Sequence, residues 1–150
     1  MPRRELKYPT QVEEWLIEWN KALPNPGHMI LIGSGGLLWH AAQGGLAEGL
    51  PESSMDVDPI TDSEDVARLC YEALVGSEFE LTHGWHVNLM PDSVLREFPS
   101  DWRNRASKKS YGNLTVEVPS AADLLIPKLK RGEPRDHAQA AWAKRMGLVD

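Results

Sequence analysis

The stretch from Met29 to Thr61 combines an apolar run, a glycine-rich segment and a pair of acidic residues. The apolar run Met29–Ile32 is long enough for a buried strand and too short for a helix. In the next segment, Gly33–Gly36, the missing side chains allow another group to approach the backbone closely. Residues 37–42 then have the pattern of a helix start. We therefore predict a strand, a tight turn and a helix, in that order.

The acidic pair Asp56 and Asp58 flanks the apolar Val57. In a strand, alternate side chains share a face, so both carboxylates would point the same way while Val57 points into a core. Pro59 cannot donate a ladder hydrogen bond, which predicts that this strand ends there or runs along an edge. Two carboxylates this close repel each other unless a positive charge lies between them, and a divalent cation is the usual solution. The pair therefore predicts a metal site.

The glycine-rich segment matches neither of two common phosphate-binding motifs. A dinucleotide-binding fingerprint needs a third small residue where Leu38 stands, and a Walker loop needs Gly-Lys-Ser/Thr. Two interpretations stay open: a phosphate held by backbone amides at a helix N-terminus, or a tight turn without a ligand. The acidic pair downstream favours the phosphate.

Length, charge and cysteine usage set broader limits. We expect residues 1–150 to form a single domain. The net charge of -6 counts mildly against nucleic acid as the main partner. The single cysteine, Cys70, fits a reducing compartment and falls on the apolar side of a predicted helix, so we expect a buried thiol. Because no apolar run approaches the length of a membrane span, we expect a cytoplasmic protein without membrane contact.

Capping signals and apolar spacing predict helices on both sides of this stretch. A capping box at Thr10–Glu13 begins a helix whose apolar stripe puts Trp15 and Trp19 in the core. A second capping box, Thr61–Glu64, begins another helix. The predicted helices cover residues 11–23, 61 to about 75, 91–98, 120 to the break at 132, and 134–146.

Further strands complete the predicted fold. Residues 78–82 and 85–90 read as a hairpin around His83-Gly84, and residues 114–118 as the last strand. Residues 99–113 look like an exposed, partly ordered connection in which Trp102 either anchors the loop or stacks on a base. The fold class is therefore α/β in the loose sense (α+β), a short mixed β-sheet of about five strands flanked by helices.

Three histidines, His40, His83 and His86, are scattered over this pattern. They lack cysteine partners and the helical spacing of a zinc-protease motif, so we do not expect zinc.

The order of strand, Gly33-Ser34 turn, helix and Asp-x-Asp resembles the nucleotidyltransferase superfamily, with Ser54–Asp58 as its small-hydroxyl-x-Asp-x-Asp segment. The tail Ser120–Asp136 is similar to the abortive-infection (type IV toxin) branch, in which a helical lysine, here Lys128, is followed by an Arg-Asp pair. The resemblance implies a nucleotidyltransferase-like fold. It also implies a nucleoside triphosphate substrate and Mg²⁺ or Mn²⁺ as cofactor.

The resemblance also assigns roles to residues. Asp56 and Asp58 would be the catalytic carboxylates and metal ligands, Gly33 and Ser34 would contact the triphosphate, and Lys128 would neutralise its charge. The acceptor would be a tRNA, a protein or a small molecule. A role in bacterial defence would add a partner protein of a toxin–antitoxin pair.

The third carboxylate of the superfamily has no clear counterpart, because Asn88 stands in the equivalent apolar-x-apolar context. An amide oxygen can coordinate magnesium, so Asn88 is the third candidate metal ligand, but an amide cannot take a proton from an attacking hydroxyl. Glu80 or Glu117, each on a predicted neighbouring strand, could substitute.

Two functions stay open: metal-dependent nucleotide transfer, and a non-catalytic nucleotide-binding or interaction module that has lost the third acid. A plain scaffold without nucleotide is a third.

Overall fold

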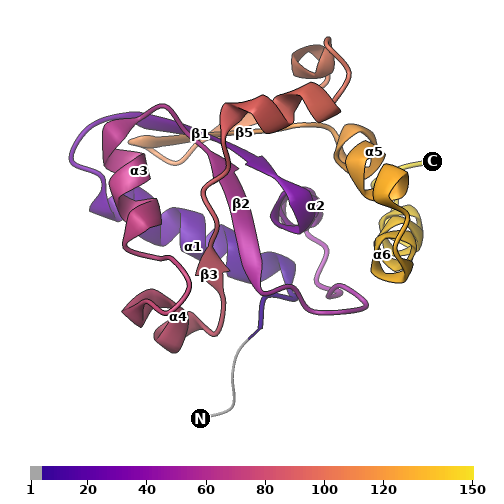
Figure 1. Cartoon of the computed structure of the whole chain (residues 1–150), viewed down its shortest axis with the longest axis horizontal. Coiled ribbons are helices and arrows are strands. Elements are labelled where there is room, and N and C mark those ends of the chain that lie inside the picture. The colour runs from indigo at the N-terminus through magenta and orange to yellow at the C-terminus, as the bar shows by residue number, and fades with distance from the viewer. Residues whose placement is uncertain (1–4) are drawn as a thin grey trace.

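The computed structural model of the chain describes residues 5–150. Its strands form one five-stranded sheet in the order β3-β2-β1-β5-β4, with helices packed on it (Figure 1). This confirms the predicted mixed sheet flanked by helices. The elements are α1 (Pro9–Ala22), β1 (Gly27–Ile32), α2 (Gly33–Gln43), β2 (Asp56–Ile60), α3 (Glu64–Tyr71), α4 (Glu78–His83), β3 (His86–Val87), the 3₁₀ helices η1 (Asp92–Glu97) and η2 (Trp102–Asn104), β4 (Ser107–Ser110), β5 (Leu114–Val118), α5 (Ala121–Arg131) and α6 (Pro134–Arg145).

Strand β1 lies at the centre of the sheet, as its apolar run predicts. It pairs antiparallel with β2, where Ile32 is opposite Asp58, and parallel with β5, where Ile30 is opposite Glu117. Met29 and Leu31 of this strand are fully buried. A strand with neighbours on both sides and helices on its faces needs such a continuous apolar run.

Helix α1 runs behind the sheet in the view of Figure 1, and its apolar stripe is in the core. Trp15 contacts Trp19 and Trp85 edge-to-face, with ring centroids 5.0 and 5.9 Å apart. Both predicted core tryptophans of this helix are therefore confirmed as core. The thiol of Cys70, on α3, is also buried as expected.

The predicted hairpin over residues 78–90 is wrong. Residues 78–83 form α4, and β3 is only two residues long and runs parallel to β2. Ser77 caps α4 by accepting a hydrogen bond from the Glu80 amide, and Gly84 ends it at a left-handed φ of 85°. The alternation Phe79-x-Leu81 suggested a strand face, but Leu81 is 83% exposed. Packing of Phe79 on Trp85 overrides the local pattern.

The expectation of an exposed connection over residues 99–113 is also wrong in part, because it contains the edge strand β4. The sequence Ser-Lys-Lys-Ser gives no apolar signal, and lysines are typical of edge strands. Lys109 donates a hydrogen bond to Glu13 across 2.8 Å. Trp102 is only 5% exposed, as expected of a side chain that anchors a loop.

The starts and ends of several helices differ from prediction. Helix α1 begins at Pro9, and the side chain that accepts a hydrogen bond from the Tyr8 amide is Gln11, at 2.7 Å. The predicted capping residue Glu13 instead contacts β4. Helix α3 ends at Tyr71, short of the expected residue 75.

Within residues 5–150, none of the helices combines the length and apolar character needed to cross a membrane.

Strand β2 continues through Pro59 to Ile60, so the alternative that it ends at the proline is wrong. The Pro59 carbonyl accepts a hydrogen bond from the Met90 amide at 2.9 Å. In this pairing the nitrogen and the carbonyl of a strand residue point to the same neighbouring strand. The Pro59 nitrogen, which has no hydrogen to donate, therefore points to the side where β3 has already ended. Pro59 therefore lies on a local edge of the sheet, as the other alternative predicted.

Candidate functional site

A cavity of about 450 Å³ opens between the sheet, the start of α2 and the C-terminal helices. The structure brings all six candidate residues from the sequence to the wall of this cavity: Gly33, Ser34, Asp56, Asp58, Asn88 and Lys128. They come from segments far apart in the chain. The neighbouring positions of β1, β2 and β3 in the sheet and the packing of α5 on α2 bring them together.

Helix α2 begins directly at Gly33, without the separate four-residue turn that the sequence suggested. Ile32 is still extended, and Gly33 makes the change of direction alone at a φ of 68°. A Cβ at Gly33 would lie 2.7 Å from Oδ2 of Asp58. Only glycine therefore lets that carboxylate lie against the helix start. The first amides of a helix have no partners within it, so this end of α2 is suited to an anion.

Ser34 and Lys128 are joined by a hydrogen bond, in which the Lys128 ammonium donates to the Ser34 hydroxyl at 3.1 Å. That hydroxyl in turn donates to Oε1 of Gln139 at 3.1 Å. The chain of contacts connects α2, α5 and α6. Burial lowers the pKa of Lys128, although the carboxylates of Asp136 and Asp58 favour its charged form. Lys128 thus presents a partly desolvated cation to the cavity.

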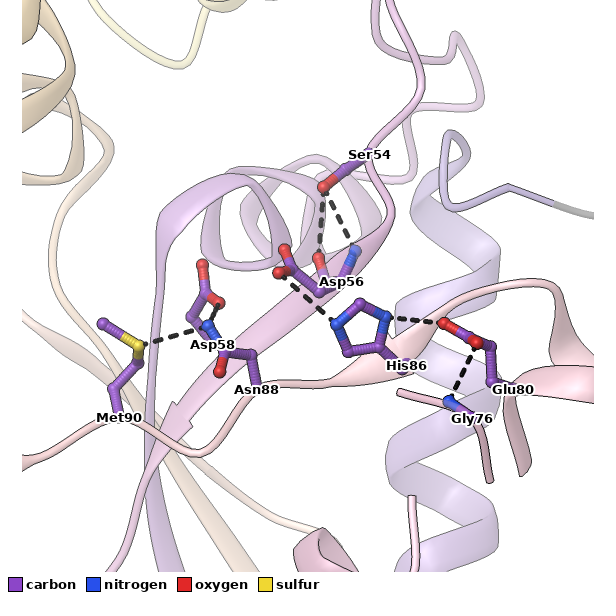
Figure 2. Close-up of polar contacts among 8 residues, drawn as sticks. All are labelled: Ser54, Asp56, Asp58, Gly76, Glu80, His86, Asn88 and Met90. Carbon is purple, nitrogen blue, oxygen red and sulfur yellow. Dashed lines mark hydrogen bonds and ion pairs between the residues drawn. The ribbon is translucent and has the colours of Figure 1, made fainter. Parts of the chain in front are cut away.

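Asp56 and Asp58 point to the same face of β2, as the alternation predicted (Figure 2). Burial and repulsion by Asp56 raise the pKa of Asp58 to about 6, against the opposing effects of Asn88, Lys128 and His86. A carboxylate with a raised pKa lacks enough positive charge around it. A divalent cation between the two side chains would supply that charge, so the donor set fits one.

His86 lies next to the acidic pair, although it is not among the residues lining the cavity, and the sequence raised it only as one of three scattered histidines. Parallel pairing of β2 and β3 places it opposite Asp56, with its Nε2 atom 3.8 Å from Oδ2 of that carboxylate. Its Nδ1 lies 2.8 Å from Oε2 of Glu80 (Figure 2). The predicted hairpin would have paired residues 85–90 with residues 78–82 instead. The contact could therefore not be found from sequence.

Asn88 follows on the next rung, beside Asp58. Its side-chain nitrogen donates to Oδ1 of Asp58 at 3.3 Å and lies 3.4 Å from the sulfur of Met90. In this structure the side-chain amide faces Asp58 with its nitrogen donor, and its role as a metal ligand stays a prediction. Asn88 thus holds Asp58 in place.

The two proposed substitutes for the third acid lie elsewhere. Glu80 is on α4, not on a strand, and contacts His86. Glu117 is on β5, where it lies 3.4 Å from His28 and is not among the residues lining the cavity. Glu97, at the end of η1, does line the cavity and was missed. Over residues 5–150, no three histidine, cysteine or acidic side chains already converge as a metal cluster.

Two arginines add positive charge on the side of the C-terminal helices. Arg131 and Arg135 both line the cavity. Arg131 makes two hydrogen bonds to the fully buried Asp136, at 2.9 and 2.7 Å, and this guanidinium lowers the pKa of that carboxyl. The cavity therefore has an acidic wall on β2 and a basic wall on α5 and α6.

A family model described as "Nucleotidyltransferase of unknown function (DUF6036)" matches residues 11–148. The match begins within α1 and runs beyond the end of α6, and so includes every residue that lines the cavity. Searches of curated proteins and of solved structures gave no match.

Proposed function

Because the chain belongs to the nucleotidyltransferase family DUF6036, we propose that it transfers a nucleotide from a nucleoside triphosphate to an acceptor, with the help of a divalent cation. One observation carries this proposal. The acidic pair Asp56 and Asp58, the start of α2 and the cation of Lys128 all line a single cavity of about 450 Å³.

Asp56 and Asp58 would hold the cation, Mg²⁺ or Mn²⁺, because they are the paired carboxylates on the acidic wall. When bound, such a cation neutralises charge on the phosphates and favours in-line displacement at the α-phosphorus. Asn88 would keep Asp58 in its rotamer through the 3.3 Å hydrogen bond. Gly33 leaves room for the same carboxylate.

The triphosphate would lie between the two walls. Backbone amides at Gly33 and Ser34 would donate to its oxygens, as helix N-termini do for anions. Lys128 would exchange its hydrogen bond with Ser34 for a phosphate oxygen, and Arg135 would add a second positive charge. Most of the catalytic effect would come from positioning and charge, since these side chains form no covalent intermediate.

The acceptor has room beside the nucleotide. A second cavity of about 550 Å³ shares Met90 with the first and continues along the same face past Ile60. Its wall mixes aliphatic side chains with Arg103 and acidic residues. We keep a tRNA, a protein or a small molecule as acceptors. On the similarity of the tail Ser120–Asp136, we extend the proposal to bacterial defence with a toxin–antitoxin partner.

Asn88 supports a second candidate function, a non-catalytic nucleotide-binding module. The superfamily position expected to carry a third acid holds an amide, which cannot accept a proton from the acceptor. Such a protein would bind nucleotide and transfer nothing.

The experiment measures binding and transfer in the same proteins. Calorimetry gives the ATP affinity, and each of the four α-³²P-labelled nucleoside triphosphates is incubated with Mg²⁺ or Mn²⁺ and with total tRNA, the protein itself, or a panel of hydroxyl- and amino-bearing small molecules. We expect label transfer by the wild type and none by Asp58→Asn. Lys128→Ala should bind ATP about tenfold more weakly, the scale of one charged hydrogen bond.

Lys130→Ala is the matched control, because Lys130 is exposed on the same helix and does not line the cavity. It should bind ATP like the wild type. Binding without transfer would favour the non-catalytic module. Equal ATP affinity in wild type and Lys128→Ala would remove the lysine from the site, and undiminished transfer by Asp58→Asn would refute the acidic pair as the catalytic centre.

A further inference from the structure

The parallel pairing of β2 and β3 places two pairs of polar side chains side by side at the edge of the cavity. Asp56 is opposite His86. The backbone amide of Asn88 donates a hydrogen bond to the carbonyl of Val57, and this places Asn88 beside Asp58. On the second rung the atom of Asn88 that faces Asp58 is the side-chain nitrogen, a donor. On the first rung the atom of His86 that faces Asp56 is the imidazole Nε2, which can bind a metal.

The ring of His86 is held in one orientation. Its Nδ1 lies 2.8 Å from Oε2 of Glu80, and both side chains are largely buried, at 18% and 13% exposed. Glu80 is itself fixed, since its Oε1 accepts a hydrogen bond from the Gly76 amide at 3.1 Å. A carboxylate can only accept, so Nδ1 carries the proton of this bond. In the neutral ring, Nε2 then keeps its lone pair on the side of Asp56.

This is the arrangement in which proteins present histidine to a metal. Metal-binding histidines nearly always donate their second ring N–H to a carboxylate, a carbonyl or water, which fixes the ring and makes the ligating nitrogen more basic. In this structure the Glu80 carboxylate holds the ring of His86 with Nε2 toward Asp56 (Figure 2).

The geometry points to Nε2 of His86 as the third protein ligand of the cation held by Asp56 and Asp58, with Glu80 as the outer partner that orients the ring. The inference rests on the proposed function. It replaces the missing third carboxylate with an imidazole, and it makes the site selective. Mg²⁺ takes oxygen ligands almost exclusively, whereas a nitrogen ligand favours transition metals, so the site should prefer Mn²⁺.

The required movement is small. Two ligand atoms each about 2.1 Å from one cation are about 3 Å apart at a right angle. The observed separation between Nε2 of His86 and Oδ2 of Asp56 is 3.8 Å. Side-chain rotation closes this gap, and the backbone of β3 stays in place because Val87 is fully buried.

A competing explanation is that His86 is protonated and forms an ion pair with both carboxylates. Removing it would then destabilise the fold and leave metal affinity little changed. The two explanations differ in whether nitrogen is bound to the metal.

The test uses the full chain and Mn²⁺ alone. Electron paramagnetic resonance gives the Mn²⁺ affinity, and electron spin echo modulation detects nitrogen bound to it. We expect a ¹⁴N coupling in the wild type that changes to a ¹⁵N coupling when histidine is ¹⁵N-labelled. His86→Ala should abolish the coupling and weaken Mn²⁺ binding more than Mg²⁺ binding. Glu80→Gln should weaken Mn²⁺ binding about 10–100-fold, the usual effect of losing an outer partner.

His83→Ala is the control, because His83 lies on the same segment but contacts Phe79 and Glu18 instead of the acidic pair. It should keep both affinity and coupling. If His86→Ala does not fold, His86→Gln takes its place, and the coupling in the wild type needs no variant. Mn²⁺ bound without histidine nitrogen would overturn this inference and leave the proposed function standing. Failure of the wild type to bind Mn²⁺ or Mg²⁺ would overturn both.

Discussion

The charge of Asp58 depends on its place in the fold. Burial, then the neighbouring charge of Asp56, raises its pKa from 3.8 to about 6. An acid with a raised pKa in the folded state stabilises the fold fully only below its unfolded pKa. That stabilisation is lost as the pH rises from about 4 through about 6. Above this window, the metal-free protein carries an unfavourable buried charge.

Replacement of this carboxylate should therefore stabilise the metal-free protein. We expect Asp58→Asn to unfold with a free energy higher than wild type by on the order of 1–3 kcal/mol at about pH 7.5, and the difference to shrink toward pH 4. Urea denaturation in the presence of a chelator at several pH values measures it. The difference between the two proteins at each pH isolates Asp58 from other titrating groups. A difference that does not vary with pH would mean that the carboxylate is not strained by its surroundings.

At the scale of the element, the start of α2 depends on one glycine. Gly33 has a φ of 68°, and its missing Cβ makes room for Oδ2 of Asp58. Gly45, just after the same helix, has nearly the same φ of 71° but nothing within 4 Å of a Cβ. The two positions share the backbone strain that a side chain would cause and differ in the contact with the carboxylate.

This pair separates conformational strain from a steric effect on the site. Gly45→Ala should cost about 1–2 kcal/mol, the strain of a left-handed residue, and leave ATP and Mn²⁺ binding unchanged. Gly33→Ala should cost more, because the new methyl group displaces Asp58, and should weaken Mn²⁺ binding by about tenfold or more. Thermal unfolding and metal titration of both variants give the comparison. Equal losses of stability with unchanged metal binding in both would show that Asp58 does not depend on this glycine.

At the scale of the whole molecule, the fold gathers negative charges on one wall of the cavity and positive charges on the other. The carboxylates of Asp56 and Asp58 lie on β2, and the cations of Lys128, Arg131 and Arg135 line the opposite side of the cavity. A ligand with positive charge toward one wall and negative charge toward the other relieves both repulsions. A metal–triphosphate complex has this distribution of charge.

A divalent cation should accordingly stabilise the whole chain. At a concentration of about 100 times its Kd, Mn²⁺ should add roughly 2.7 kcal/mol to the free energy of unfolding. For a chain of this size that corresponds to a rise in Tm of roughly 5–10 °C. Asp58→Asn should show little of this rise although its metal-free form is the more stable one. Differential scanning calorimetry measures both, with Ca²⁺ and Mg²⁺ for comparison. A wild-type Tm unaffected by any divalent cation would exclude a metal site at this pair.

The sequence by itself determined the parts of the molecule that depend on neighbours in the chain. The buried strand at Met29–Ile32, the alternation of Asp56 and Asp58 and the last strand at Leu114–Val118 were all predicted and are present, whereas the helix after the first strand begins at Gly33 and not after a separate turn. An apolar run, a residue without a side chain and a period of two are local signals. The role of these residues, and of Lys128, stays a prediction.

Only the tertiary structure decided the rest, because contacts with distant residues override local pattern there. The alternating segment at residues 78–83 became a helix when Phe79 packed against Trp85. The polar segment Ser107–Ser110 became a strand because β5 offers it hydrogen-bond partners. The parallel pairing of β3 with β2 brought His86 to Asp56. Which side chains meet across two strands depends on direction and register, and those are fixed by the burial of residues far away in the chain.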